Sequence, residues 1–367
     1  MDVTIAVWTW VLGAVLMTAL GAVARGAAEE VWPGQVRPEA LVALDAEPFG
    51  GEGVPYSGAG VPLAHARALQ HAGTPISYSD FAAICGWAFS FGYAYDDRWT
   101  ACMAVCGAPG RDGPYEVFRW LTERLGYEYV GVPVAEAERF VGFVKEHVGA
   151  GTPIITDQMD GGLIYGHRER GGLQQVWFGG PVGAGWLAPG GFQGPVWAYV
   201  LKRKGEAMER RQLYREALER AIRKAAPHEW DGVPQGLAAL EAYRRDVADP
   251  TKDFANRTEW FCWAAFERLS ARLCCAQWLA EAAEVLGGEE ERPLKMASRH
   301  YQRAFQGYDR FYAALGSAEA TGLGLLERVR TPERIAVLVP ILNEVIAQEK
   351  AGIEDMRRGL SALGKAE

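Results

Sequence analysis

Cysteine is scarce in this chain and does not form a dense framework. The six cysteines among the 367 residues are Cys85, Cys102, Cys106, Cys262, Cys274 and Cys275. This small share excludes a scaffold held mainly by disulfides. Cys262 and Cys274 fall in one predicted helix, where about 1.5 Å of rise per residue separates them by roughly 18 Å and prevents a bond. A disulfide between Cys102 and Cys106 stays open, but we expect mostly free, buried thiols.

Clusters of basic residues and of metal ligands are also lacking. The formal net charge is -8, and the stretches at residues 202–204 and 210–211 are short and close to glutamates. Such stretches are typical of a solvated helix face, and phosphate binding needs larger clusters of Lys and Arg. No His or second Cys pair stands at zinc-ligand spacing from Cys102 and Cys106. We therefore expect no nucleic-acid partner, no metal and no cofactor.

A long uncharged run is present near the N-terminus. Residues 3–24 are mostly apolar and long enough to cross a bilayer as a helix. A cleaved signal peptide is favoured by the small residues at 22–24, whereas the missing basic segment favours a retained anchor. A buried first helix of a soluble protein is the third alternative. We predict that residues 1–25 are a signal peptide or membrane anchor and that the protein is extracytoplasmic, either anchored or secreted.

The next part of the chain changes from helical to strand patterns. Residues 26–62 are rich in Gly, Pro and Ala, which predicts a linker or wrapping arm. Helices are predicted at residues 63–72, from a cap at Ser77, Ser79 or Asp80 through Phe89, from Pro114 through Leu125, and at residues 134–148. Short strand patterns follow at residues 153–156, 163–165, 175–178 and 196–201. Helices followed by an antiparallel sheet predict an α+β domain over residues 63–205.

The rest of the chain, residues 206–367, has only helical patterns. One helix is marked by Leu213 and Ala217, another by Leu237 and Leu240, and a long one spans residues 258–286. Two more open at Pro293 and at Pro332, the latter behind the cap candidate Thr331, and Pro340 should kink the last helix. We therefore predict a separate all-α domain.

Two motifs of the α+β part resemble those of a known protein family. Residues 75–78 (PISY) lead into residues 84–89 (ICGWAF), and residues 162–167 (GLIYGH) follow in the sheet. They resemble the N-terminal domain of the butirosin-biosynthesis BtrH family, which is similar to papain-like bacteriocin-processing peptidases. The resemblance covers roughly Val61 to Gly205 and implies a papain-like fold with an antiparallel sheet. A helical C-terminal part accompanies such domains in some relatives.

The resemblance implies catalytic residues that this sequence does not have. The family's chemistry uses a Cys near the start of the first helix, a His beginning a strand, and an Asp or Asn that orients the His. The first position falls near Val61-Pro62-Leu63, without Cys, and the second falls on Gly161-Gly162. Both the nucleophile and the base are therefore expected to be missing.

Cys85 and His167 are the alternative catalytic pair. In the papain pattern the Cys directly precedes an aromatic residue, whereas Gly86 separates Cys85 from Trp87, a displacement of about 100° around a helix. His167 follows its strand pattern instead of opening it. A buried Cys and a surface or hydrogen-bonded His are the preferred interpretations, and a thiol-dependent hydrolase or acyltransferase is the alternative.

A ligand-binding cleft is the remaining site hypothesis. Its candidate residues are Tyr93, Asp96, Asp97, Trp99, Asp157, Asp160 and Trp177. Carboxylates could hold a ligand and aromatic rings could line a cleft, although turns, caps and core packing are the usual roles of such residues. The sequence favours a non-catalytic papain-like binding or scaffold protein whose partner is an unidentified protein or small molecule.

Overall fold

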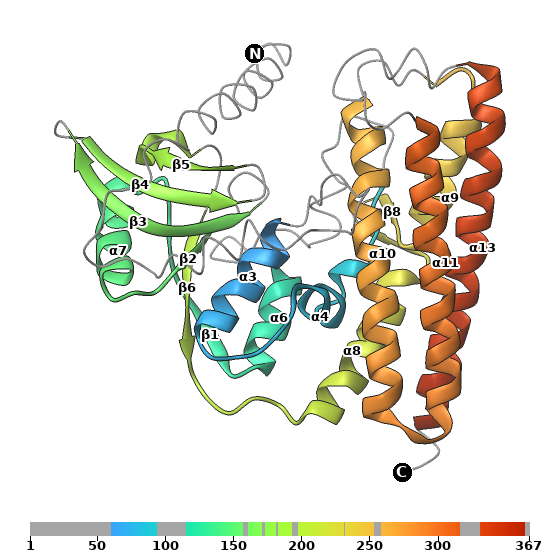
Figure 1. Ribbon diagram of the computed structural model, residues 1–367, viewed down its shortest axis with the longest axis horizontal. Helices are drawn as coiled ribbons and strands as arrows, with labels where there is room; N and C mark the ends of the chain where they lie inside the picture. The colour runs from blue at the N-terminus through green and yellow to red at the C-terminus, as the bar shows by residue number, and fades with distance from the viewer. Residues whose placement is uncertain are drawn as a thin grey trace. The chain divides into compact units, whose positions relative to one another are not determined.

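The computed structural model divides into two compact units (Figure 1). It describes residues 60–93, 115–156, 161–170, 173–180, 183–192, 197–230, 232–252, 258–315 and 331–363. Among these, the first unit takes residues 60–76 and 128–203, and the second takes residues 77–127 and 204–363. Within these described ranges, the chain therefore crosses between the units three times.

The first unit is a sheet with a helix on each face. Its elements are α3 (Gly60–His71), β1 (Tyr127–Pro133), α7 (Ala137–Gly149), β2 (Ile154–Thr156), β3 (Gly162–Arg170), β4 (Leu173–Gly180), β5 (Gly183–Leu187), the 3₁₀ turn η3 (Pro189–Gly191) and β6 (Trp197–Arg203). The strand order is β1-β6-β2-β3-β4-β5. The pairs β6–β2, β2–β3, β3–β4 and β4–β5 are antiparallel. This confirms the predicted α+β content with an antiparallel sheet.

Buried side chains alternate between the two faces of the sheet, so each face has its own hydrophobic core. Ile154 pairs with Ile164, and both pack toward α7, whose Phe140 is buried against them. The next pair, Ile155 and Leu163, points to the other face and packs toward α3. Successive side chains of a strand point to opposite faces, so a buried pair on each side fixes the register.

The predicted strand runs correspond to β2, β3, β4 and β6, but two strands of this six-stranded sheet were not predicted. β1 contains Gly131 and ends at Pro133, and β5 contains Gly183 and Gly185. Gly and Pro are depleted in strands and weaken the sequence pattern. Both strands lie at the edges of the sheet, where pairing with one neighbour suffices.

The second unit is mainly helical. Its elements are α4 (Tyr78–Ile84), η1 (Trp87–Phe89), α6 (Glu116–Arg124), α8 (Arg210–Ala225), β7 (His228–Trp230), β8 (Val233–Gln235), α9 (Leu237–Ala248), α10 (Thr258–Leu286), η4 (Gly288–Glu290), α11 (Glu291–Leu315) and α13 (Pro332–Leu363). The long helices α10, α11 and α13 lie side by side (Figure 1). The helical C-terminal region is confirmed, with the predicted bounds for α10 and with the Thr331 hydroxyl accepting from the Arg334 amide. The prediction that this region is all-α is wrong, because β7 and β8 pair as a two-stranded antiparallel sheet.

The division between the units is not the linear one predicted at residue 205. Residues 77–127 belong to the helical unit. The Tyr93 amide donates to the Pro234 carbonyl at 3.3 Å, and the Gly236 amide donates to the Phe91 carbonyl at 2.7 Å. These bonds join segments far apart in sequence, which no local pattern shows.

The predicted N-terminal segment, residues 1–25, lies outside the described residues, as does nearly all of the predicted linker. Among the described residues, no helix is both long enough and apolar enough to cross a bilayer.

A buried ion pair lies in the core of the helical unit. Arg272 of α10 and Glu349 of α13 are 1% and 2% exposed. Two guanidinium nitrogens of Arg272 donate to the Glu349 carboxylate at 2.7 and 2.9 Å, and a third donates to the Ala88 carbonyl at 2.5 Å. Burial alone would lower the pKa of Arg272, but the Glu349 carboxylate raises it above its usual range, so Arg272 stays charged.

We predict that Glu349→Gln strongly destabilises the protein. The substitution leaves the Arg272 charge buried without its counter-charge, which costs about 3–5 kcal/mol. Chemical denaturation measures the free energy of unfolding. Glu354→Gln is the matched control, because it removes an exposed pair with Arg357 and should cost about 0–1 kcal/mol. Equal small losses for the two variants would contradict this account of the core.

Candidate functional site

Cys85 lies at the end of α4, in the second unit. The predicted helix through Phe89 is interrupted, because Gly86 adopts φ 86° and a 3₁₀ turn follows. Cys85 has no exposed surface, and its thiol donates to the Ala82 carbonyl at 3.5 Å. Burial raises the pKa of Cys85 to about 12. The thiol is therefore neutral at physiological pH, unlike an activated nucleophile.

Arg220 lies next to Cys85, but it binds the Cys85 backbone carbonyl and not the thiol. The Arg220 guanidinium donates to the Cys85 carbonyl at 2.7 Å and makes two bonds, of 3.1 and 2.7 Å, with the Glu116 carboxylate. The Arg220 charge acts to lower the pKa of Cys85, but burial outweighs it. The cation therefore fixes the end of α4 without activating the thiol.

His167 lies on β3, in the first unit. It pairs with Val176 of β4 and is half-buried. Burial lowers the pKa of His167, and the Lys145 charge lowers it further. The ring is therefore neutral near pH 7. Cys85 and His167 belong to different units.

The start of α3 meets the start of β3 in the first unit. Gly161 has φ 93°, and a Cβ there would lie 2.3 Å from the Val61 amide nitrogen. A Cβ on Gly162 would lie 2.4 Å from the Phe178 ring. Neither position has room for a side chain larger than hydrogen. The close approach of Val61, Gly161 and Phe178 thus requires the two glycines.

His65 is a buried titratable residue that the sequence analysis missed. It lies one turn along α3 from Val61, is 1% exposed, and its Nδ1 donates to the Val61 carbonyl at 2.8 Å. The ring packs edge-on against Tyr129 at 5.7 Å. Burial lowers the pKa of His65 to about 4, which keeps it neutral. The sequence signal for its burial was its position within the otherwise apolar run of residues 61–66.

Tyr93 and Trp177, two of the predicted cleft residues, lie in different units. The Tyr93 hydroxyl donates to the Asp246 carboxylate at 3.0 Å, and its ring packs edge-on against Tyr243 at 5.1 Å. Tyr93 is buried, so it packs in the helical unit as a core residue.

Trp177 belongs to a row of aromatic residues on the sheet, formed by Tyr165, Trp177 and Trp186. The Trp177 indole donates to the Tyr165 hydroxyl and packs edge-on against Trp186 at 5.3 Å. The Arg168 guanidinium lies 4.0 Å from the centre of the Trp186 ring. Trp177 and Trp186 are half-buried, and Trp and Arg are enriched in interface cores.

The other predicted cleft residues lie outside the described residues. They are Asp96, Asp97, Trp99, Asp157 and Asp160. Within the described part of the chain, no group of three or more His, Cys, Asp and Glu side chains is placed to hold a metal ion.

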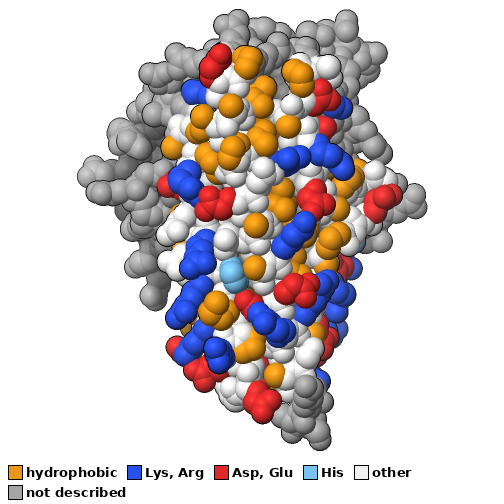
Figure 2. Space-filling model, turned by 90° about the vertical axis from the view of Figure 1, so that its right-hand side faces the viewer, with side chains coloured by type: hydrophobic (Ala, Val, Ile, Leu, Met, Phe, Trp, Pro, Cys, Tyr) orange, Lys and Arg blue, Asp and Glu red, His pale blue; other side chains and the backbone are white. Residues whose placement is uncertain are grey.

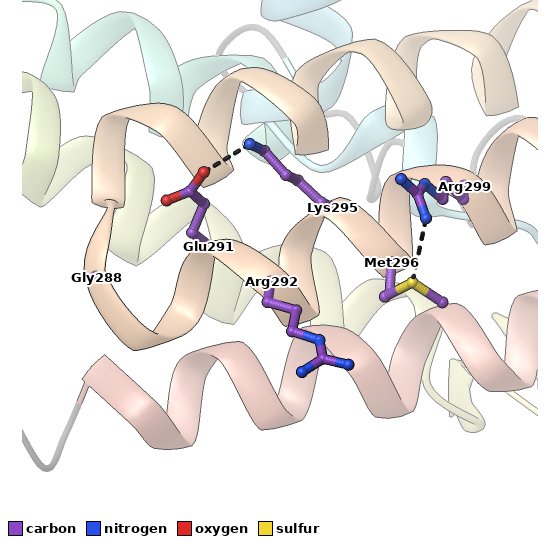
Figure 3. A pocket seen from close by; sticks show the side chains of 6 residues that line it. All are labelled: Gly288, Glu291, Arg292, Lys295, Met296 and Arg299. Carbon is purple, nitrogen blue, oxygen red and sulfur yellow. Dashed lines mark hydrogen bonds and ion pairs between the residues drawn. The ribbon is translucent and has the colours of Figure 1, made fainter.

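A pocket of about 390 Å³ lies on the helical unit (Figure 3). Its lining residues, all from η4 and α11, are Gly288, Glu291, Arg292, Lys295, Met296 and Arg299. Glu291 pairs with Lys295 at 2.6 Å. The cations outnumber the carboxylate, so the pocket is locally positive. Figure 2 shows basic and acidic side chains mixed over the lower half of one face and hydrophobic side chains gathered above.

No protein-family model matches the sequence, and no curated protein matches it.

We predict that Gly162→Ala destabilises the first unit by about 1–3 kcal/mol, because the added methyl group would overlap the Phe178 ring. Chemical denaturation followed by tryptophan fluorescence provides the measurement. Gly185→Ala is the matched control: nothing lies within 4 Å of the added methyl group, and the expected change is within about 0.5 kcal/mol. If Gly162→Ala is as mild as the control, the β3 start has room for a side chain.

Proposed function

We propose that this chain is a non-catalytic binding or scaffold protein with a papain-like α+β unit. In this proposal residues 1–25 export or anchor the protein, and the helical unit offers a further contact surface. The partner is a protein or a small molecule, and not a nucleic acid. The single observation that carries the proposal is the contact between the start of α3 and the start of β3.

Thiol catalysis of the papain type needs a particular contact between two elements. The nucleophile stands near a helix start, the imidazole opens a strand, and the two side chains lie within hydrogen-bond reach. Here a helix start and a strand start are in contact, but they carry Val61 and Gly161. The Phe178 ring fills the space next to Gly162. The contact thus supports a papain-like unit that has neither a nucleophile nor room for a base.

The alternative, a thiol-dependent hydrolase or acyltransferase using Cys85 and His167, is less well supported. A nucleophilic cysteine needs a pKa that is lowered by a cation or a helix N-terminus, and it needs access for the substrate. Cys85 is fully buried, lies at a helix C-terminus, and has a pKa raised to about 12 by that burial. The thiol is neither ionised nor accessible.

The aromatic row in the first unit supports the binding role. Trp177 and Trp186 combine large apolar rings with indole N–H donors, and Arg168 adds a cation over the Trp186 ring. Buried Trp and Arg side chains contribute most of the affinity in many protein interfaces. The half-buried side chains of Trp177, Trp186 and Arg168 therefore form the surface of the first unit at which we expect a partner to bind.

A pull-down from native membranes tests the proposal with the full-length protein. We expect wild-type protein to fractionate with membranes or the exported pool and to retain a specific partner. Trp186→Ala should weaken that retention by about thirtyfold or more, because a tryptophan at an interface hot spot contributes about 2 kcal/mol or more. Cys85→Ser is the control and should retain the partner fully. Loss of the partner in Cys85→Ser, with Trp186→Ala unchanged, would contradict a thiol-independent binding role.

A further inference from the structure

Helix α11 carries a row of basic side chains along its solvent-exposed face. At about 100° per residue, Arg292, Lys295, Arg299, Arg303 and Arg310 fall within an arc of about 80°. All five are exposed, and at about 1.5 Å of rise per residue they extend over about 27 Å. Because three to seven positions separate neighbouring members in the sequence, they form no continuous basic run. We call these five residues the basic stripe.

The buried face of α11 keeps the basic stripe turned to the solvent. Leu294, Tyr301 and Tyr308 are at most 1% exposed, and α11 packs on both α10 and α13. A helix with one apolar and one charged face is fixed in its rotation by burial of the apolar face. The stripe is therefore a permanent surface of the helical unit.

Two members of the basic stripe already have a carboxylate partner. Lys295 pairs with Glu291 at 2.6 Å, and Arg310 pairs with Glu344 of α13 at 2.8 Å. These pairs reduce the positive charge at two places, and the three arginines between them carry the rest.

Arg292, Arg299 and Arg303 have no carboxylate partner among the residues that the structure describes. The Arg299 Nη1 atom donates to the Met296 sulfur at 3.8 Å, and a thioether is a weak acceptor. Within the described ranges, Arg292 and Arg303 make no side-chain hydrogen bond or ion pair. A guanidinium has five donors, so these three side chains can bind acceptors of another molecule.

The pocket of about 390 Å³ lies at the N-terminal end of the basic stripe (Figure 3). Three of its lining residues, Arg292, Lys295 and Arg299, belong to the stripe. Arg292 points away from the pair between Glu291 and Lys295. An acidic side chain that enters the pocket therefore meets cations that Glu291 does not neutralise.

We propose that the basic stripe binds a short segment of a partner protein that is rich in Asp and Glu. The carboxylates of this segment pair with Arg292, Arg299 and Arg303, since the planar fork of a guanidinium matches a carboxylate in bidentate geometry. This inference rests on the proposed binding role of the helical unit and gives that role a place and a partner chemistry.

A membrane or a nucleic acid fits the basic stripe less well than an acidic segment. The chain has a formal net charge of -8, which repels a large anionic surface outside the stripe. Among the described side chains of α11, Met296 is the one exposed large hydrophobic residue, whereas helices that lie on membranes present several. An extended segment of about eight residues spans about 26 Å and contacts the stripe alone.

Binding of a fluorescein-labelled octaglutamate peptide to the full-length protein tests the proposal. Fluorescence anisotropy measures the Kd at about 50 mM salt, where charge pairs are only partly screened. We expect saturable binding, which the triple variant Arg292→Gln, Arg299→Gln, Arg303→Gln weakens by about tenfold, because each exposed charge pair contributes about twofold to threefold in affinity.

The matched control is a second triple variant, Arg139→Gln, Arg203→Gln, Arg245→Gln. It removes three exposed arginines outside the basic stripe and changes the net charge by the same amount. Its Kd for octaglutamate should change by less than about twofold, since no direct pair is lost.

Two results would overturn the proposal: no saturable binding of octaglutamate to the wild type, or equal weakening in the two triple variants. A third is tighter binding of octathymidylate or of phosphatidylglycerol vesicles that only the stripe variant loses, because the stripe then serves a nucleic acid or a membrane. The pull-down tests the surface around Trp186 and this titration tests the basic stripe, so either proposal can fail alone.

Discussion

A charge pair between Arg272 and Glu349 lies almost completely buried in the helical unit, and its hydrogen bonds fix the surrounding elements. Arg272 also binds the Ala88 carbonyl, which accepts from the Cys275 thiol at 3.2 Å as well. This carbonyl belongs to η1, directly after α4 and Cys85. A buried guanidinium needs all its donors satisfied, so η1 is held against α10. The same arrangement keeps Cys85 inside the core, where its thiol stays neutral.

Elements with a strong local pattern were predictable, and elements formed by long-range contacts were not. α10 and the caps at Ser77 and Thr331 follow from helical periodicity and capping residues. The membership of residues 77–127 in the helical unit depends on bonds such as that from Gly236 to Phe91, which join distant parts of the chain. Local propensity contains no information about such pairs.

The candidate site could likewise be predicted only in part from the sequence. Gly161 and Gly162 can be read from the sequence, but only the structure shows that Val61 and Phe178 lie so close that neither glycine has room for a side chain. Glycine identity can be read directly from the sequence, whereas the burial of a side chain depends on its tertiary neighbours.

The central claim is that Cys85 is not an activated thiol, and alkylation of the folded protein tests it most directly. Iodoacetamide is added near neutral pH, and peptide mass mapping compares Cys85 with the buried thiols Cys274 and Cys275 and with the unfolded protein. The account predicts that Cys85 labels as slowly as Cys274 and Cys275 in the folded state and rapidly only after unfolding. Rapid, selective alkylation of Cys85 that His167→Ala abolishes would contradict it.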